Sequence, residues 1–123
     1  MNNILMIFVG GGLGSLARYG ISVFVKSNFQ FVFPLATLLS NIISCVVLAI
    51  VVGIFSEKVL TNNSLAALIV IGFCGGFSTF STFSFETVEL FRNGNNSFAI
   101  ANILISITAC LGIIFFLTKS NPV

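Results

Sequence analysis

Residues 73–86 read Phe-Cys-Gly-Gly-Phe-Ser-Thr-Phe-Ser-Thr-Phe-Ser-Phe-Glu, and this stretch decides the fold. Phenylalanine recurs at positions 77, 80 and 83, and hydroxyl side chains stand at 78, 79, 81, 82 and 84. A lipid-facing surface needs no such cluster of hydroxyls, and a lone strand cannot satisfy its backbone in hydrocarbon. We therefore expect a helix that is broken at Gly75 and Gly76, where the non-helical backbone is buried in protein or lines a cavity.

The depth of this break follows from helix geometry. At about 1.5 Å per residue, the segment from Leu65 to Gly75 covers about 15 Å, which is half of a hydrocarbon core roughly 30 Å thick. Carbonyl oxygens freed near the midplane characteristically coordinate a cation such as sodium, and two antiparallel copies could share one ion. The alternative is an intact helix, in which the hydroxyls bond to carbonyls one turn earlier and the glycines allow close packing.

The flanking sequence places this stretch in a membrane. Of 123 residues, 57% are hydrophobic and 7% are charged, whereas soluble domains carry about 25% charged residues. The first span lacks a basic segment before it and a small-residue cleavage site after it, so we expect it to be retained. The sequence predicts an all-α membrane protein with a single transmembrane domain over residues 1–123 and four spans, at about 4–25, 35–55, 65–91 and 98–117.

The positive charges are nearly balanced between the two ends of the spans. Lys58 and Lys119 lie on the side of the termini, against Lys26 and Arg92 in the opposite loops, with Arg18 nearer the latter. Because Lys and Arg bias normally sets orientation, a chain without that bias can insert both ways. The alternative is that one or two charges suffice to fix a single orientation.

Composition also excludes several classes of function. The chain has no histidine and three carboxylates, too few for paired acid and base chemistry, so we expect no enzyme activity. Its basic residues form no run, and we expect no nucleic-acid partner. The three cysteines, at 45, 74 and 110, show no metal-ligand or disulfide spacing, and we interpret them as small packing residues.

The first span carries small residues and one charge. Gly10 and Gly14 form a small-xxx-small face, which predicts close contact with another helix. Arg18 lies towards the loop end, where it could snorkel to the interface or draw anions into a vestibule.

Polar side chains also recur in the second and fourth spans. Asn41 requires a hydrogen-bond partner, and Thr37 lies one turn earlier on the same face. Its amide could bond to a neighbouring helix or donate to a permeating anion. Asn102, Ser106 and Cys110 recur at i, i+4 and i+8, a stripe that suits either a pore wall or helix packing.

Three motifs together resemble the CrcB/Fluc family of microbial fluoride channels. They are Gly-Gly-x-Gly-Ser-x-x-Arg-Tyr at 11–19, Thr-Leu-x-x-Asn at 37–41, and Gly-Phe-Cys-Gly-Gly-x-Ser-Thr-Phe-Ser-Thr-Phe-Ser-x-Glu at 72–86. The resemblance spans the whole chain. It implies a fluoride-selective channel of the cell inner (plasma) membrane that exports fluoride passively and relieves its toxicity. It also implies a dual-topology dimer of two antiparallel identical subunits, with two narrow pores and a central, structural sodium ion.

The resemblance also assigns residues. Phe80 and Phe83 are similar to the phenylalanines that line the fluoride path, and Asn41 is similar to its amide donor. Gly75 and Ser78 would supply main-chain carbonyls to sodium. Phenylalanine suits this role because the ring edge carries the positive end of the quadrupole and can hold an anion weakly, as conduction requires.

The polar track is the less regular part of the resemblance. Thr37, Asn102 and Ser106 resemble its positions, and Arg18 would lie on the pathway at the vestibule. Asn102 and Cys110 depart from the tyrosine and hydroxyl residues seen in some relatives.

Two other classes share parts of this pattern. A small multidrug resistance type proton-coupled transporter also has four spans in a short dual-topology chain, but it depends on a carboxylate in the first helix, and this first span has none. A holin or an accessory membrane subunit would need no buried polar constellation, so the clustered hydroxyls disfavour that class.

Overall fold

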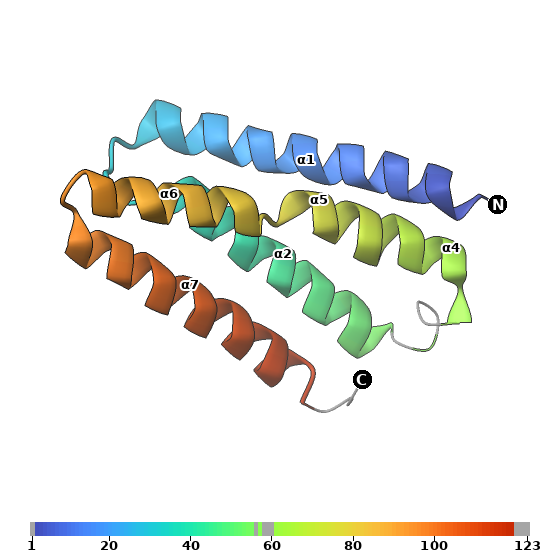
Figure 1. The fold of residues 1–123 in the computed structure, drawn as a ribbon. Coiled ribbons are helices and arrows are strands. Elements are labelled where there is room, and N and C mark those ends of the chain that lie inside the picture. The colour runs from blue at the N-terminus through green and yellow to red at the C-terminus, as the bar shows by residue number, and fades with distance from the viewer. Residues whose placement is uncertain (1, 56, 58–60, 120–123) are drawn as a thin grey trace.

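The computed structural model describes residues 2–55, 57 and 61–119, and its long helices lie side by side (Figure 1). Within this part of the chain there is no strand. The helices long and apolar enough to cross a membrane are Asn3–Asn28, Leu35–Ile54, Asn63–Arg92 and Asn96–Leu117. The predicted four apolar spans are therefore confirmed, with bounds that differ by at most three residues.

The first, second and fourth spans are each one continuous helix. They are α1 (Asn3–Asn28), α2 (Leu35–Ile54) and α7 (Asn96–Leu117). The side-chain oxygen of Asn2 accepts a hydrogen bond from the N–H of Ile4 and so caps α1 at 2.9 Å. The α1–α2 and α6–α7 connections lie at one end of the bundle, opposite the N-terminus (Figure 1).

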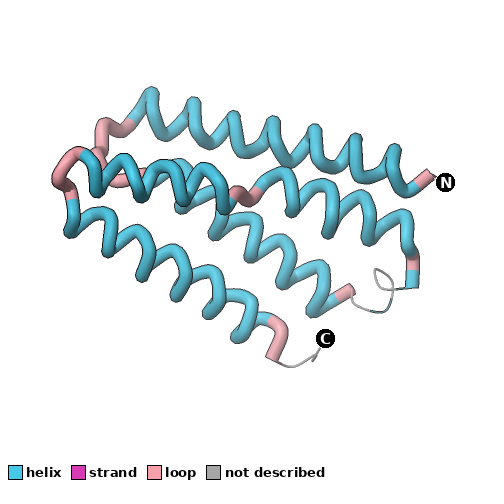
Figure 2. The backbone as a smooth tube through the Cα atoms, in the orientation of Figure 1, coloured by secondary structure: helices cyan, strands magenta, loops and turns pink. Residues whose placement is uncertain are grey.

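The third span is made of several pieces. It begins with α4 (Asn63–Leu65), continues as the π-helix η1 (Ala66–Cys74) and α5 (Gly75–Phe77), and resumes as α6 (Phe80–Arg92). Figure 2 shows the short non-helical connection before α6. The two residues there, Ser78 and Thr79, are extended, with φ/ψ of −79°/157° and −152°/118°.

The expected break point at Gly75 and Gly76 is wrong. Both glycines are helical and belong to α5, which ends at Phe77, and the extended backbone begins at Ser78. The physical reason is that hydroxyl and amide side chains at this later point can satisfy the backbone groups that an interrupted helix leaves unpaired. Glycine alone offers no such partner.

The glycines instead set the distance between α1 and the first half of the third span. A Cβ added at Gly10 would collide with the Leu68 carbonyl, and one at Gly14 would collide with the Phe73 carbonyl and lie 2.8 Å from the Phe77 nitrogen. The predicted close contact of Gly10 and Gly14 with another helix is therefore confirmed. Backbone packs against backbone here, as small residues allow in membranes.

Candidate functional site

Asn41 on α2 holds the extended pair in place. Its Nδ2 donates to the Thr79 carbonyl at 3.2 Å, and its Oδ1 accepts from the Thr79 N–H at 2.7 Å. Thr79 is 9% exposed, so both of its backbone groups need partners within the protein. Thr79 takes one of the two amide hydrogens of Asn41. The Asn41 side chain thus holds the extended backbone at Thr79, in a role that we call the clamp on the break. Asn41 also lines a cavity, described below.

Side-chain hydrogen bonds stabilise the end of the helix before the break and the start of the helix after it. The Cys74 carbonyl accepts from the Ser78 N–H at 3.1 Å, from Ser78 Oγ at 2.9 Å and from Ser44 Oγ at 3.0 Å. On the other side, Thr79 Oγ1 accepts from the Thr82 N–H at 3.1 Å and caps the start of α6. The break is therefore fully supported by its neighbours.

These bonds change the surroundings of two carbonyls predicted to bind sodium. In an unbroken helix the Gly75 carbonyl would accept from the N–H of Thr79, but that N–H donates to Asn41. The Ser78 carbonyl would likewise accept from the N–H of Thr82, which donates to the Thr79 hydroxyl. Gly75 and Ser78 therefore lack the donors that a continuous helix gives, while the Gly75 position itself is exposed.

A cavity of about 300 Å³ adjoins the break, and we call it the Asn41 cavity. Phe80 and Phe83 lie in its wall with ring centroids 5.6 Å apart and planes tilted by 40°. Phe83 is 8% exposed, whereas Phe80 is 77% exposed on the outer side of the chain. The cavity thus brings together four of the predicted pathway residues, and its lining is Asn41, Cys45, Ser78, Thr79, Phe80, Phe83, Ser106, Ile107, Cys110 and Leu111.

Asn102 lies behind this cavity rather than in its wall. Ser106 Oγ donates to Asn102 Oδ1 at 3.2 Å, Asn102 Nδ2 donates to Thr87 Oγ1 at 2.9 Å, and Thr87 Oγ1 donates to the Phe83 carbonyl at 2.7 Å. Asn102 is 2% exposed. This chain of hydrogen bonds joins α7 to α6, so the interhelical role is what the geometry supports for Asn102.

Arg18 and Thr37 line a separate space of about 250 Å³, which we call the Arg18 cavity. Ser40 also lines it, and its Oγ is buried without a hydrogen-bond partner among the described residues. The Arg18 guanidinium can donate N–H bonds to a negatively charged guest, and the Ser40 hydroxyl can donate an O–H bond. The lining is Ser15, Arg18, Tyr19, Ser22, Ala36, Thr37, Ser40 and Thr82.

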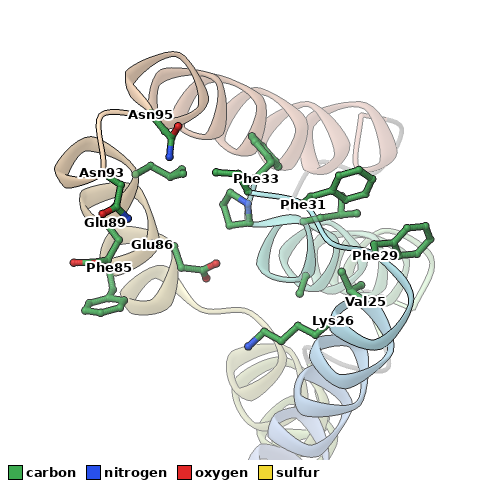
Figure 3. A pocket seen from close by; sticks show the side chains of 15 residues that line it. Val25, Lys26, Phe29, Phe31, Phe33, Phe85, Glu86, Glu89, Asn93 and Asn95 are labelled. Carbon is green, nitrogen blue, oxygen red and sulfur yellow. The ribbon is translucent and has the colours of Figure 1, made fainter.

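A third cavity, of about 310 Å³, lies at the end of the bundle beside the α1–α2 connection. Figure 3 shows Lys26 from α1 and Glu86 from α6 reaching into it from opposite sides. Glu86 Oε1 accepts a hydrogen bond from the Thr37 hydroxyl, so a residue of the Arg18 cavity contacts a residue of this one. Charged groups therefore continue from the Arg18 cavity to the bundle end.

Sequence reasoning did not single out Thr79, Thr87 or Glu86. Thr79 precedes α6 and stands three residues before Thr82, which is the spacing of a helix N-cap and its third residue. That spacing could have located the break. Nothing local marks the partners of Thr87 and Glu86, because Asn102 and Thr37 come from other helices.

Comparison with known proteins identifies the family. A family model described as "CrcB-like protein, Camphor Resistance (CrcB)" matches residues 5–118. A relative from Citrifermentans bemidjiense is 40% identical over 111 residues, covering 90% of this chain and 90% of the relative. One from Ruminiclostridium cellulolyticum is 38% identical over 111 residues, covering 90% and 85%. One from Coxiella burnetii is 38% identical over 110 residues, covering 89% of each chain. All three are named fluoride-specific ion channel FluC. Because the family model matches most of the chain and these relatives are 38–40% identical to it, the chain belongs to the CrcB-like family.

Proposed function

We propose that this chain is a fluoride-selective ion channel of the cell inner (plasma) membrane, through which fluoride leaves passively so that its toxicity is relieved. The observation that carries the proposal is the Asn41 cavity, where an amide and two phenylalanine rings meet beside a broken helix. The relatives named fluoride-specific ion channels support the same function. Conduction is not an enzymatic reaction, and no residue acts as a catalyst.

The cavity offers fluoride weak, closely placed positive groups. Fluoride must lose its water, and a selective pore must replace that water with donors. The second amide hydrogen of Asn41 can donate to the ion, while the edges of Phe80 and Phe83 present the positive part of their quadrupoles. Ser106 also lines this wall, but its hydroxyl hydrogen is donated to Asn102, so Asn41 and the two ring edges are the groups that we propose hold the ion.

The Arg18 cavity is the proposed entrance. Its guanidinium attracts an anion, and the Ser40 hydroxyl can replace part of the ion's hydration, whereas the Thr37 hydroxyl hydrogen is already donated to Glu86. The small multidrug transporter is not favoured, because α1 contains no carboxylate that could couple transport to protons.

The functional unit that we propose is a homodimer of antiparallel subunits. Support comes from Phe80 and Gly75, which face outward from the single chain, so that a second copy could close the wall beside them. A Cβ at Gly75 would meet nothing within 4 Å in its own chain. A side chain at Gly75 would therefore contact the partner subunit of the proposed dimer rather than atoms of its own chain.

Balanced charge supports insertion in both directions. Lys26 and Arg92 lie in the last turns of α1 and α6. Lys119 follows the C-terminal end of α7, which lies at the other end of the bundle (Figure 1), and Lys58 lies outside the described residues. Reporters fused to the C-terminus should appear on both sides of the membrane, and two lysines added to one loop should drive one orientation. A wild type found in one orientation would contradict the identical antiparallel pair.

Sodium would lie between the two breaks, held by the main-chain carbonyls of Gly75 and Ser78. The fit is supported by the diversion of their helical donors to Asn41 and Thr79. Carbonyl oxygens of an unwound membrane segment are suitable sodium ligands. The ion would hold the two breaks together and contribute no chemistry to the transported fluoride.

The experiment that tests the function uses purified protein in liposomes. Liposomes loaded with fluoride should release it down its gradient, and liposomes loaded with chloride should retain their content. Protein-free liposomes of the same lipid are the control. Absence of fluoride release, or equal release of chloride, would refute fluoride-selective conduction.

A further inference from the structure

Two cysteines from different helices line the Asn41 cavity. Cys45 lies one turn after Asn41 on α2, and Cys110 lies one turn after Ser106 on α7. All four residues belong to the same cavity wall. Because residues four apart share a helix face, the two cysteines extend the faces that α2 and α7 turn toward this cavity.

The two thiols are close to each other and chemically free. They line the same cavity from two helices that pack on each other, neither is in a disulfide, and both are half-buried. The third cysteine, Cys74, is buried in η1 and does not line this cavity. Its main-chain carbonyl accepts hydrogen bonds from Ser44 and Ser78. Within the described residues no three Cys, His, Asp or Glu side chains form a metal-binding group, and the Asn41 cavity holds two thiols, those of Cys45 and Cys110.

A pair of thiols without a third ligand favours particular metal ions. Thiolates are soft ligands that suit Cu(I) and Zn²⁺ but not Mg²⁺, which takes oxygen. Because Zn²⁺ takes four ligands, a site with two thiols favours ions that accept two ligands. We propose that Cys45 and Cys110 form a two-coordinate site for a soft, thiophilic metal ion in the wall of the Asn41 cavity. Two thiolates give a neutral complex with Hg(II) and a complex of charge −1 with Cu(I) or Ag(I), so Hg(II) is the ion that suits a wall with two phenylalanines best.

Binding proceeds by exchange of protons for metal. Each thiol loses one proton as its sulfur bonds to the ion, so one Hg(II) replaces two protons and the product is neutral. No oxidant or reductant is consumed. The bound metal would link α2 to α7 beside the phenylalanine rings and narrow the cavity.

The metal site stands on the cysteine geometry alone, whereas block of conduction rests on the proposed fluoride channel. The first measurement therefore needs no transport. Protein treated with one equivalent of HgCl2 is washed with excess 2-mercaptoethanol, a monothiol that strips single-thiol adducts, and its mercury content is measured. Wild type and Cys74→Ala should keep one mercury per chain, and Cys45→Ala and Cys110→Ala should lose it. Loss from wild type, or equal retention in Cys45→Ala, would overturn the site.

The second measurement compares fluoride release with and without HgCl2, each variant against its own metal-free rate. Wild type and Cys74→Ala should slow by about tenfold or more, because conduction tolerates little obstruction of the pore wall, and dithiothreitol should restore them. Cys45→Ala should be insensitive. Retained mercury with unchanged release would overturn the placement of the site in the pore wall. A metal-free wild type that releases no fluoride would instead refute the channel and leave the metal site standing.

Discussion

The two halves of the third span are held by different means. Its first half, η1 and α5, packs on α1 through glycines, with backbone against backbone. Its second half, α6, packs on α7 and is tied to α2 and α7 by side-chain hydrogen bonds from Asn41, Thr37 and Asn102. The first half has no space for larger side chains at its contact with α1. The second half presents polar groups and two phenylalanines to a cavity.

This difference suggests that the first half of the third span is a scaffold and that the second half lines the proposed fluoride pathway. Close glycine packing in a membrane gives van der Waals contact and leaves no space for an ion. Hydrogen bonds from neighbouring helices allow α6 to begin anew after an extended pair, which sets Phe80 and Phe83 beside Asn41. Substitutions in the first half should therefore affect folding, and those in the second should affect conduction.

The largest effect is expected at the glycine contact. Gly14→Ala places a methyl group against the Phe73 carbonyl and the Phe77 nitrogen. Backbone atoms cannot move aside as a side chain can, so we expect a loss of about 3 kcal/mol or more, at the severe end of overpacking. Thermal unfolding in detergent and the yield of monodisperse protein measure it.

Gly12→Ala is the matched control, because a Cβ at Gly12 meets nothing within 4 Å. It should be neutral or stabilise the helix by up to about 1 kcal/mol. Equal behaviour of the two variants would show that the first half of the span is not held by this contact.

The next effect concerns the clamp on the break. Asn41→Ala leaves the N–H and the carbonyl of Thr79 without their partner, and an unpaired buried group costs about 1–3 kcal/mol. We expect moderate destabilisation together with loss of fluoride release. Both are measured on the same preparation, by thermal unfolding and by liposome efflux.

Asn41→Asp separates the two roles of this side chain. It keeps an acceptor for the Thr79 N–H but places negative charge where the anion passes, so fluoride release should fall through repulsion. An Asp variant that is as active as wild type would remove Asn41 from the pathway and leave it as a clamp alone.

The smallest effect is expected at Ser78. Ser78→Ala removes one donor from the Cys74 carbonyl, which keeps bonds from the Ser78 N–H and Ser44. The cost should be about 0.5–1.5 kcal/mol, that of one ordinary hydrogen bond. Fluoride release and its dependence on sodium should persist, because the proposed ligand is the main-chain carbonyl. Loss of the sodium effect in a folded variant would identify the hydroxyl as the ligand.

The lengths of the apolar segments and the spacing of the glycines made the four spans and the close contact of α1 predictable. Twenty or so apolar residues between polar turns define a span, and Gly10 and Gly14 on one face predict a close contact. The position of the break was not predictable from glycine, because it depends on Asn41, a residue of another helix, reaching Thr79.

The candidate site was predictable in its residue types but not in its grouping. Asn41, Phe80, Phe83 and Ser106 do share a cavity. Arg18 and Thr37 line a different one, and Asn102 lies behind the wall. A stripe at i, i+4 and i+8 indicates one helix face, but rotation against the neighbouring helices decides which members of that face are exposed to a cavity.

The central claim is that the phenylalanines after the break form the conducting wall, and fluoride efflux from liposomes tests it most directly. Phe83→Ile and Phe80→Ile keep apolar bulk but remove the aromatic edge. Phe116→Ile, at an exposed position near the end of α7, is the matched control. We predict that both pathway variants fold and assemble as wild type does but lose most fluoride release, while the control retains it. Full fluoride release by both Phe80→Ile and Phe83→Ile would contradict the claim.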